Sequence, residues 1–312
     1  MATRVLLTVD TELVWRHHEA ALSWQDNFAR SYEAAGVGVP YQLRLLADHG
    51  LKACFFVDPM PALVHGLEPV RRMVEPILEA GQEVQLHLHP FWARHGEAFR
   101  ELNEYEGGEQ QALIEQARDL LVAAGAPAPI AFRAGSYAAN ADTLRALAAL
   151  GIRYDSSQNG SEHLSDLAID PAQLAPAPIE GMVEIPVGQI EHQPGRLRHL
   201  QLCAVSFAEM RAALDHAVRQ EHPLANIVTH SFELARRDGL APNGLAVSRF
   251  RRLCRYLADH CEAMPTVHFA DLDDLPLGGD ARPYRSPRLL TIGRMAQQAW
   301  GNARYERVRR VG

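Results

Sequence analysis

Long apolar runs are absent from this sequence of 312 residues, because no window approaches the roughly 18 consecutive apolar residues that a membrane span needs. Neither a basic region nor a small-residue cleavage site precedes the strand-like residues that begin at Arg4, so a secretion signal is not expected. The four cysteines form no Cys-x-x-Cys pair, which predicts reduced core residues instead of disulfides or a metal knuckle. These absences predict a cytoplasmic protein.

Positive charge is scarce over most of the chain. The net charge is −7, but residues 281–312 hold eight Arg and one Glu, so the other 280 residues carry a net charge of −14. An acidic body argues against nucleic acid as the main partner. Glycine-rich phosphate loops are also missing, since Gly36 and Gly38 come shortly before a proline and not before a dinucleotide fingerprint. We therefore expect a body of residues 1–280 and a basic, helical tail of residues 281–312.

Apolar strands alternate with helical segments, and most of these helices end at a glycine just before the next strand. The expected strands are residues 4–9, 53–58, 83–88, 130–133, 152–154, 183–187, 226–229 and 266–269, and the helices between them include 68–80, 109–124, 141–150, 207–219 and 247–260. Such alternation indicates an α/β fold with a parallel sheet of right-handed βαβ units. Seven or eight repeats favour a (β/α) barrel over an open sheet, because a barrel brings distant strand ends together.

Three strands end in groups that bind metals or transfer protons. The first delivers Asp10 and Glu12, the third delivers His87 and His89, and another delivers His230. Residues i and i+2 of a strand point to the same side, so His87 and His89 are able to approach one ion together. One carboxylate and two imidazoles suit Zn²⁺ and leave a position open for water, as a hydrolytic site requires. Glu12, His87 and His89 are therefore the expected ligands of one divalent metal, most simply Zn²⁺, although a structural His pair would give the same pattern.

The remaining candidates would move protons or hold charge. Asp10 is the expected general base and His230 the expected general acid. Arg133 ends another strand and would keep Asp10 ionised, although an ordinary salt bridge has the same sequence pattern. The turn that contains Ser136 and Tyr137 would present a backbone N–H to a developing oxyanion.

Residues 4–270 resemble the NodB-homology polysaccharide deacetylases, which form carbohydrate esterase family four. Residues 8–12, Thr-Val-Asp-Thr-Glu, resemble the first motif of that family, in the branch where the base and the metal-binding carboxylate are spaced as Asp-x-Glu. Residues 52–57 are similar to the second strand of the family and residues 81–87 to the segment that leads to its first ligand His. Residues 132–137 are similar to the Arg motif, residues 151–157 to a later strand end and residues 229–230 to the closing His motif. The resemblance implies a distorted, often seven-stranded (β/α) barrel that uses a divalent metal to remove acyl groups from sugars.

One ligand position departs from the family pattern. The second His of the family's His-x-x-x-His would fall at position 91, where this chain has Phe91. The third ligand is then His89, with His95 or His17 as alternatives.

The expected activity is removal of an N-acyl group, acetyl in the simplest case, from a sugar in polysaccharide or glycolipid biosynthesis, with the sugar carried on a lipid or a nucleotide. A second hypothesis keeps the site but changes the substrate to a formamide or to a cyclic imide or ureide. A third is a barrel without metal that binds glycans or serves as a scaffold.

The basic tail contains one apolar stripe at helical spacing. Its members are Ile292, Met295, Ala296, Ala299, Trp300 and Ala303. One hypothesis is a final helix docked on the acidic body, where opposite charge favours it. The other is an interfacial helix in peripheral contact with the anionic inner face of a membrane.

Overall fold

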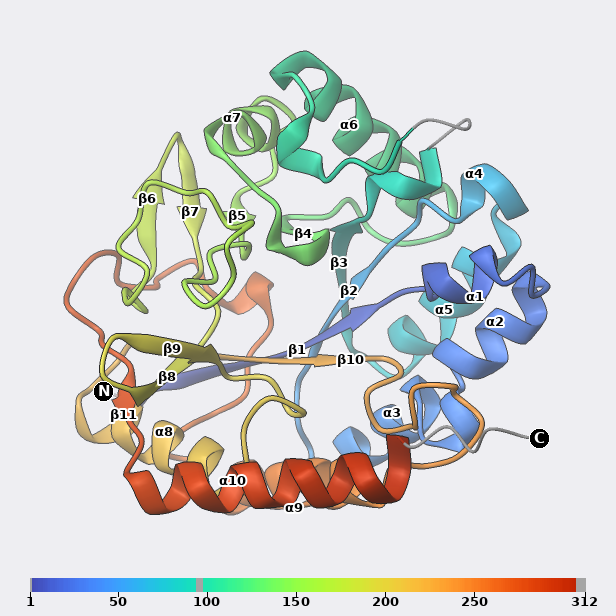
Figure 1. Ribbon diagram of the computed structural model, residues 1–312. Helices are drawn as coiled ribbons and strands as arrows, with labels where there is room; N and C mark the ends of the chain where they lie inside the picture. Colours follow the sequence, from blue (N-terminus) through green and yellow to red (C-terminus); the bar gives the residue numbers. More distant parts are fainter. Residues whose placement is uncertain (1, 94–97, 307–312) are drawn as a thin grey trace.

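The computed structural model describes residues 2–93 and 98–306 (Figure 1). Its main sheet has eight strands in the order β10-β1-β2-β3-β4-β5-β7-β6, and every neighbouring pair is parallel except β6 with β7. The strands are β1 (Arg4–Thr11), β2 (Cys54–Val57), β3 (Glu83–Leu88), β4 (Ala131–Ala134), β5 (Tyr154–Asp155), β6 (Ala177–Ile179), β7 (Met182–Glu184) and β10 (Leu224–His230).

This sheet is curled into a half-barrel, so the expected α/β fold with a distorted barrel is confirmed. Within the described residues, no strand pairing closes the ring between β10 and β6. The strand expected at residues 266–269 was wrong: Thr266 forms a single bridge with Val5, and Phe269 begins a short 3₁₀ turn. This segment therefore pairs with β1 at one residue only and does not form a strand.

Alternation along β1 sorts its side chains onto two faces. Val5, Leu7 and Val9 join the large core under the helices, whereas Leu6 joins a smaller core inside the curl, which includes Phe56. Side chains of a strand alternate between its two faces, so Asp10, four residues after Leu6, lies on the same face as Leu6 and points to the inside of the curl. β1 is buried from Val5 to its end at Thr11, and the carboxylate of Asp10 therefore lies at the carboxyl end of the sheet.

Helices cover the outer face of the sheet (Figure 1). They are α1 (Trp15–Glu19), α2 (Trp24–Ser31), α3 (Val39–Asp48), α4 (Ala62–His65), α5 (Glu68–Glu79), α6 (Gly107–Ala123), α7 (Ala141–Ala149), α8 (Phe207–Arg219), α9 (Gly244–Asp259) and α10 (Arg288–Gly301). Several have side-chain caps; at the start of α8, for example, Ser206 accepts from the backbone N–H of Glu209, whose carboxylate accepts from the N–H of Ser206.

A second sheet of three strands was not expected from the sequence. It has the order β11-β8-β9, with β8 (Gln189–Gln193), β9 (Arg196–His199) and β11 (Tyr284–Arg285). β8 and β9 form an antiparallel hairpin, and β11 pairs in parallel with β8. This pairing holds the start of the tail against the body and leads directly into α10.

The cysteines only partly follow expectation. All four are free, as predicted, and Cys54 and Cys254 are buried, but Cys203 and Cys261 are exposed. Cys203 lies in a turn after β9 and Cys261 follows α9, where neither packs into the core. Among the described helices, none combines the length and the apolar character that a membrane crossing requires.

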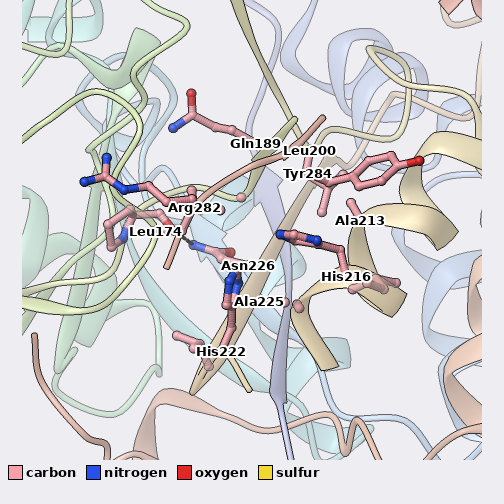
Figure 2. A pocket seen from close by; sticks show the side chains of 15 residues that line it. Leu174, Gln189, Leu200, Ala213, His216, His222, Ala225, Asn226, Arg282 and Tyr284 are labelled. Atoms are coloured by element: carbon pink, nitrogen blue, oxygen red, sulfur yellow. Dashed lines mark hydrogen bonds between the residues drawn. The ribbon is translucent and has the colours of Figure 1, made fainter. Parts of the chain in front are cut away.

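A small cavity lies near the start of β10, and Figure 2 shows His216, His222 and Asn226 among the side chains around it. Its volume of about 30 Å³ is enough to hold water. Because Leu224 and Asn226 begin β10 and His230 ends it, this cavity is remote from the candidate catalytic groups.

Candidate active site

Strand register brings the predicted residues together at one edge. Asp10 on β1 is directly paired with His230 on β10, and His87 on β3 is directly paired with Arg133 on β4. All four side chains therefore come from the carboxyl ends of parallel strands, where α/β folds gather their active sites.

Glu12, His87 and His89 converge on one point. Glu12 Oε2 lies 2.6 Å from His89 Nε2 and 3.8 Å from His87 Nε2. One ligand atom from each of the three residues lies within 4.8 Å of the others, so the set is able to hold one metal ion. His87 Nδ1 is 2.7 Å from the carbonyl oxygen of Arg133, which as an acceptor fixes the proton on Nδ1 and leaves the lone pair of Nε2 for an ion. This carboxylate and two imidazoles fit Zn²⁺ or a similar divalent ion.

His89 is the third member of this cluster. Its ring lies against Gly135, where an added Cβ would stand only 2.3 Å from His89 Nδ1, so residue 135 has to be glycine. The ring of Phe91 packs on the other side, with ring centroids 4.6 Å apart. Of the alternatives, His17 is engaged by Asn27 at 3.2 Å, away from the cluster, and His95 lies outside the described residues.

Burial and charge set the protonation of these ligands. Burial lowers the pKa of His87 to about 4, so this imidazole is neutral at neutral pH. Burial also disfavours the charged forms of His89 and Glu12, but their mutual attraction outweighs it. The attraction raises the pKa of His89 to about 9 and lowers that of Glu12 to about 2. Without metal these two residues form an ion pair, and an incoming metal ion would have to replace the proton on His89.

Asp10 is held by a buried arginine. Arg133 Nη1 donates to Asp10 Oδ1 at 2.6 Å and to Thr8 Oγ1 at 2.9 Å, while its Nε and Nη2 donate to Ser156. The guanidinium is fully buried and lies over the ring of Phe56. Burial alone would raise the pKa of Asp10, but the charge of Arg133 outweighs it and lowers that pKa below its usual value. Asp10 is therefore an ionised carboxylate held in one orientation.

His230 faces Asp10 and is held from behind by Glu233. Its Nε2 lies 3.9 Å from Asp10 Oδ2, and its Nδ1 lies 3.5 Å from Glu233 Oε2. Glu233 is buried and accepts from the backbone N–H of His230 and from Thr229 Oγ1, both at 3.0 Å. Burial acts to lower the pKa of His230, but the hydrogen bond with Glu233 and the charge of Asp10 raise it to about 9. The imidazole is thus protonated at neutral pH, as a general acid must be.

The turn at Ser136 and Tyr137 lies next to His89 through Gly135. Both residues have positive φ, 54° and 58°, in the left-handed region that costs free energy for residues other than glycine. The hydroxyl of Tyr137 is buried and has no hydrogen-bond partner in the described part of the chain. Burial and the charge of Asp10 raise the pKa of this phenol well above its usual value, so it is a neutral donor beside the catalytic groups.

Two acidic groups of the site were missed in the sequence. Glu233 lies three residues after His230, and that spacing was its only signal. Asp58 follows β2, accepts from the backbone N–H of Met60 at 3.0 Å and lies close enough to His89 for their charges to interact. Burial raises the pKa of Asp58 to about 7.

Aromatic rings form a wall beside the metal ligands. The ring of Trp15, on α1, lies 4.9 Å from the rings of both Phe91 and Trp92. The ring of Phe91 in turn packs against that of His89. The segment that contains Trp15 comes shortly after Glu12, so one stretch of chain supplies both a candidate metal ligand and part of the wall.

Comparison with solved structures finds the same fold in a protein from Mycobacterium smegmatis provisionally named a polysaccharide deacetylase. It has a TM-score of 0.53 and 17% identity, and the alignment covers 90% of this chain and 94% of that one. A 4-alpha-glucanotransferase from Thermococcus litoralis has a TM-score of 0.55 and 12% identity over 89% of this chain and 42% of its own. A family 4 carbohydrate esterase from Streptomyces lividans in complex with acetate gives a TM-score of 0.43 and 14% identity over 90% and 98%. No family model and no curated protein matches the chain.

At these identities the similarity shows the fold. The Mycobacterium smegmatis protein and the Thermococcus litoralis protein, both with TM-scores above 0.5, are named for different activities, a deacetylase and a glucanotransferase, so the fold alone does not select the reaction. The reaction has to be argued from the side chains at the carboxyl end of the sheet.

Proposed function

We propose that this protein is a metal-dependent hydrolase that removes an N-acyl group, acetyl in the simplest case, from a sugar. The proposal is supported above all by the cluster of Glu12, His87 and His89. Next to it lie the ionised carboxylate of Asp10 and the protonated imidazole of His230. A site with an ionised base, a protonated acid and a three-residue metal site contains what amide hydrolysis requires.

Glu12, His87 and His89 would hold one divalent ion, with Zn²⁺ as the first candidate. When bound, such an ion supplies Lewis-acid chemistry, because it polarises an acyl carbonyl and lowers the pKa of a water toward about 7. Asp10 takes the proton of the attacking water, since Arg133 keeps its carboxylate ionised and fixed at 2.6 Å. Mutation of Arg133 would therefore act through Asp10.

His230 donates a proton to the departing amine. Glu233 holds the imidazole in place and, with Asp10, keeps it protonated at neutral pH. The backbone N–H groups of the Ser136 and Tyr137 turn, beside Gly135, would donate hydrogen bonds to the acyl oxygen as it gains negative charge.

A sugar is the substrate class that the fold supports best. The Mycobacterium smegmatis and Thermococcus litoralis structures, both with TM-scores above 0.5, are named for enzymes of sugar polymers, a polysaccharide deacetylase and a glucanotransferase. The rings of Trp15 and Phe91 lie beside His89, and aromatic side chains of this kind are common in ligand-binding sites. The lipid- or nucleotide-linked form of the sugar and the cytoplasmic location stay predictions.

The test measures hydrolysis by the protein loaded with Zn²⁺, as free amine released from the acylated sugars and as ring-opened carboxylate formed from the imide. N-acetylated oligosaccharides, an N-formyl amino sugar and a cyclic imide are offered in parallel, and Asp10→Asn serves as the matched inactive control. The proposal expects release from the acylated sugars by the wild type only. Hydrolysis of the imide alone would move the protein to the second hypothesis. Protein that binds no zinc, or that binds zinc and hydrolyses none of the three, would contradict the proposal and favour a glycan-binding or scaffold role.

A further inference from the structure

Helix α10 contacts the body through its polar side. Arg294, only 2% exposed, donates from Nε to Glu209 Oε1 at 3.2 Å, and Glu209 is fully buried. Farther along the helix, Gln297 accepts from Arg249 at 3.1 Å and Gln298 donates to the carbonyl of Ala204 at 3.3 Å. The tail is therefore docked on the body, and a buried ion pair of opposite charges holds it there.

The apolar stripe of the same helix faces away from the body. Leu289 is 82% exposed, Ile292 61%, and Met295 and Trp300 56% each. A surface helix of a globular protein normally turns its apolar side to the core, and this helix does the opposite. Four of the ten large apolar side chains that are exposed among the described residues lie on this one helix. Such a concentration marks an interaction surface.

Basic groups flank the stripe. Arg288 begins the helix and is exposed, Arg304 follows its end and is exposed, and α10 itself contains no Asp or Glu. Farther on, the sequence adds three more arginines among residues 307–312, which lie outside the described range. An apolar ridge with cationic ends fits a partner that is apolar inside and anionic at its surface.

A groove beside the helix has the same combination of chemistry. It lies between α10 and the turn of the β8–β9 hairpin and has a volume of about 580 Å³. Its lining includes the apolar Ile292 and Met295 together with Arg285, Arg288 and Glu191. Arg285 is paired with Glu191 at 2.6 Å, so Arg288 is the cation available to a ligand there. An acyl chain with an anionic headgroup matches these walls.

A second copy of the chain fits this surface less well. In a two-fold dimer the same patch meets itself, so each ridge of Leu289, Ile292 and Met295 would bring its flanking Arg288 and Arg304 toward those of the partner. Like charges brought together at an interface are unfavourable unless acidic groups separate them, and α10 has none.

We propose that α10 is an interfacial helix that binds the enzyme to an anionic lipid bilayer through Leu289, Ile292, Met295 and Trp300. The orientation suits the active site. The end of α10 lies near the loop between His230 and α9, because Arg236 of that loop lies over the ring of Tyr305, 5.7 Å from its centroid. A Cβ added at Gly301 would also meet Leu245 at the start of α9. A protein bound through α10 therefore holds the carboxyl end of its sheet near the membrane, where a substrate carried by the lipid surface would be found.

The experiment uses the full chain and co-sedimentation with two kinds of vesicle, pure phosphatidylcholine and phosphatidylcholine with 30% phosphatidylglycerol. Truncation of the tail is avoided because it would leave Glu209 buried without its partner. The double variant Ile292→Ser/Met295→Ser removes exposed apolar groups only, and Val122→Ser on α6, 43% exposed, is its matched control. For charge, Arg288→Gln is matched by Arg71→Gln, an exposed arginine on α5.

The wild type should bind the anionic vesicles and not the neutral ones. The double variant should lose roughly a hundredfold in affinity, since each of the two apolar side chains withdrawn from lipid costs about tenfold. Arg288→Gln should lose about fivefold, the value of one basic group near an anionic surface, and both controls should bind like the wild type. No binding to anionic vesicles, or equal binding by the double variant, overturns the proposal. The proposal is also overturned if sedimentation velocity shows a dimer of the wild type that is lost in the double variant, and vesicles capture neither protein.

Discussion

Replacing Glu233 by Gln isolates the charge that keeps His230 protonated. Glu233 Oε2 lies 3.5 Å from His230 Nδ1, and glutamine has nearly the same size and still offers an oxygen to the N–H groups that Glu233 accepts from. An opposite charge within about 4–6 Å moves a pKa by roughly 1–3 units. The pKa of His230, about 9 in the wild type, should therefore fall by at least about one unit in the variant.

The sign of the effect follows from the role proposed for His230 as an acid. The proposed hydrolysis uses the protonated imidazole, so kcat/KM should fall as pH rises through the pKa of His230, about 9 in the wild type. In Glu233→Gln this basic limb should move to lower pH, while zinc content stays the same because Glu233 is not a ligand. The stability that protonated His230 contributes is complete below about pH 6.5 and is lost as pH rises toward 9, so the melting temperature of the wild type should fall more over that range than that of the variant. A rate–pH profile from pH 6 to 10 that keeps its basic limb in Glu233→Gln would refute the reasoning.

Three further predictions concern the base and the ligands. Asp10→Asn should lower turnover by roughly 10²–10⁴-fold and keep its zinc, because the amide preserves the shape but cannot take a proton; stoichiometric loss of metal would make Asp10 a ligand. His89→Ala should weaken zinc binding by more than the roughly 10–100-fold typical of residues behind the ligands, as measured by metal content after dialysis, whereas His17→Ala should keep it; the reverse result would move the third ligand. Binding of zinc at pH 7 should release about one proton, since the pKa of His89 is about 9 without metal, and calorimetry in buffers of different ionisation enthalpy would show no such dependence if this were wrong.

The residues of the candidate site were predictable because strands have a simple period. Alternation in β1 fixes which face Asp10 occupies, and the i, i+2 spacing places His87 and His89 on one side. Parallel strands end at the same edge, which brings Arg133 and His230 to Asp10 from distant parts of the sequence. Their roles in catalysis still depend on the experiments above.

Residues that lie outside any periodic pattern could not be predicted from the sequence. Asp58 and Glu233 lie just beyond their strands, and their importance comes from contacts with His89 and His230 that only the folded chain creates. The two strands of the β8–β9 hairpin contain one apolar residue each, Ile190 and Leu197, which is too few for a periodic pattern. Helix α1 is held by ring contacts such as that of Trp15 with Trp92. Short elements of this kind are stabilised by tertiary packing more than by local propensity.

The tail shows what amphipathic spacing leaves undetermined. The stripe through Ile292, Met295 and Trp300 was visible in the sequence, but its direction was not. That direction depends on the buried pair of Arg294 and Glu209, which is separated by 85 residues in sequence and turns the polar side of α10 inward. A charge that is buried has to be paired, and here the pairing outweighs the usual preference for apolar contact.

Anomalous diffraction at the zinc edge from crystals grown with Zn²⁺ tests the central claim most directly. The metal site inferred from Glu12, His87 and His89 predicts one strong peak at full occupancy, about 2.0–2.2 Å from a carboxylate oxygen of Glu12 and from Nε2 of both histidines. No peak at these residues, or a peak bound by Asp10 or Asp58 in place of His89, would contradict it.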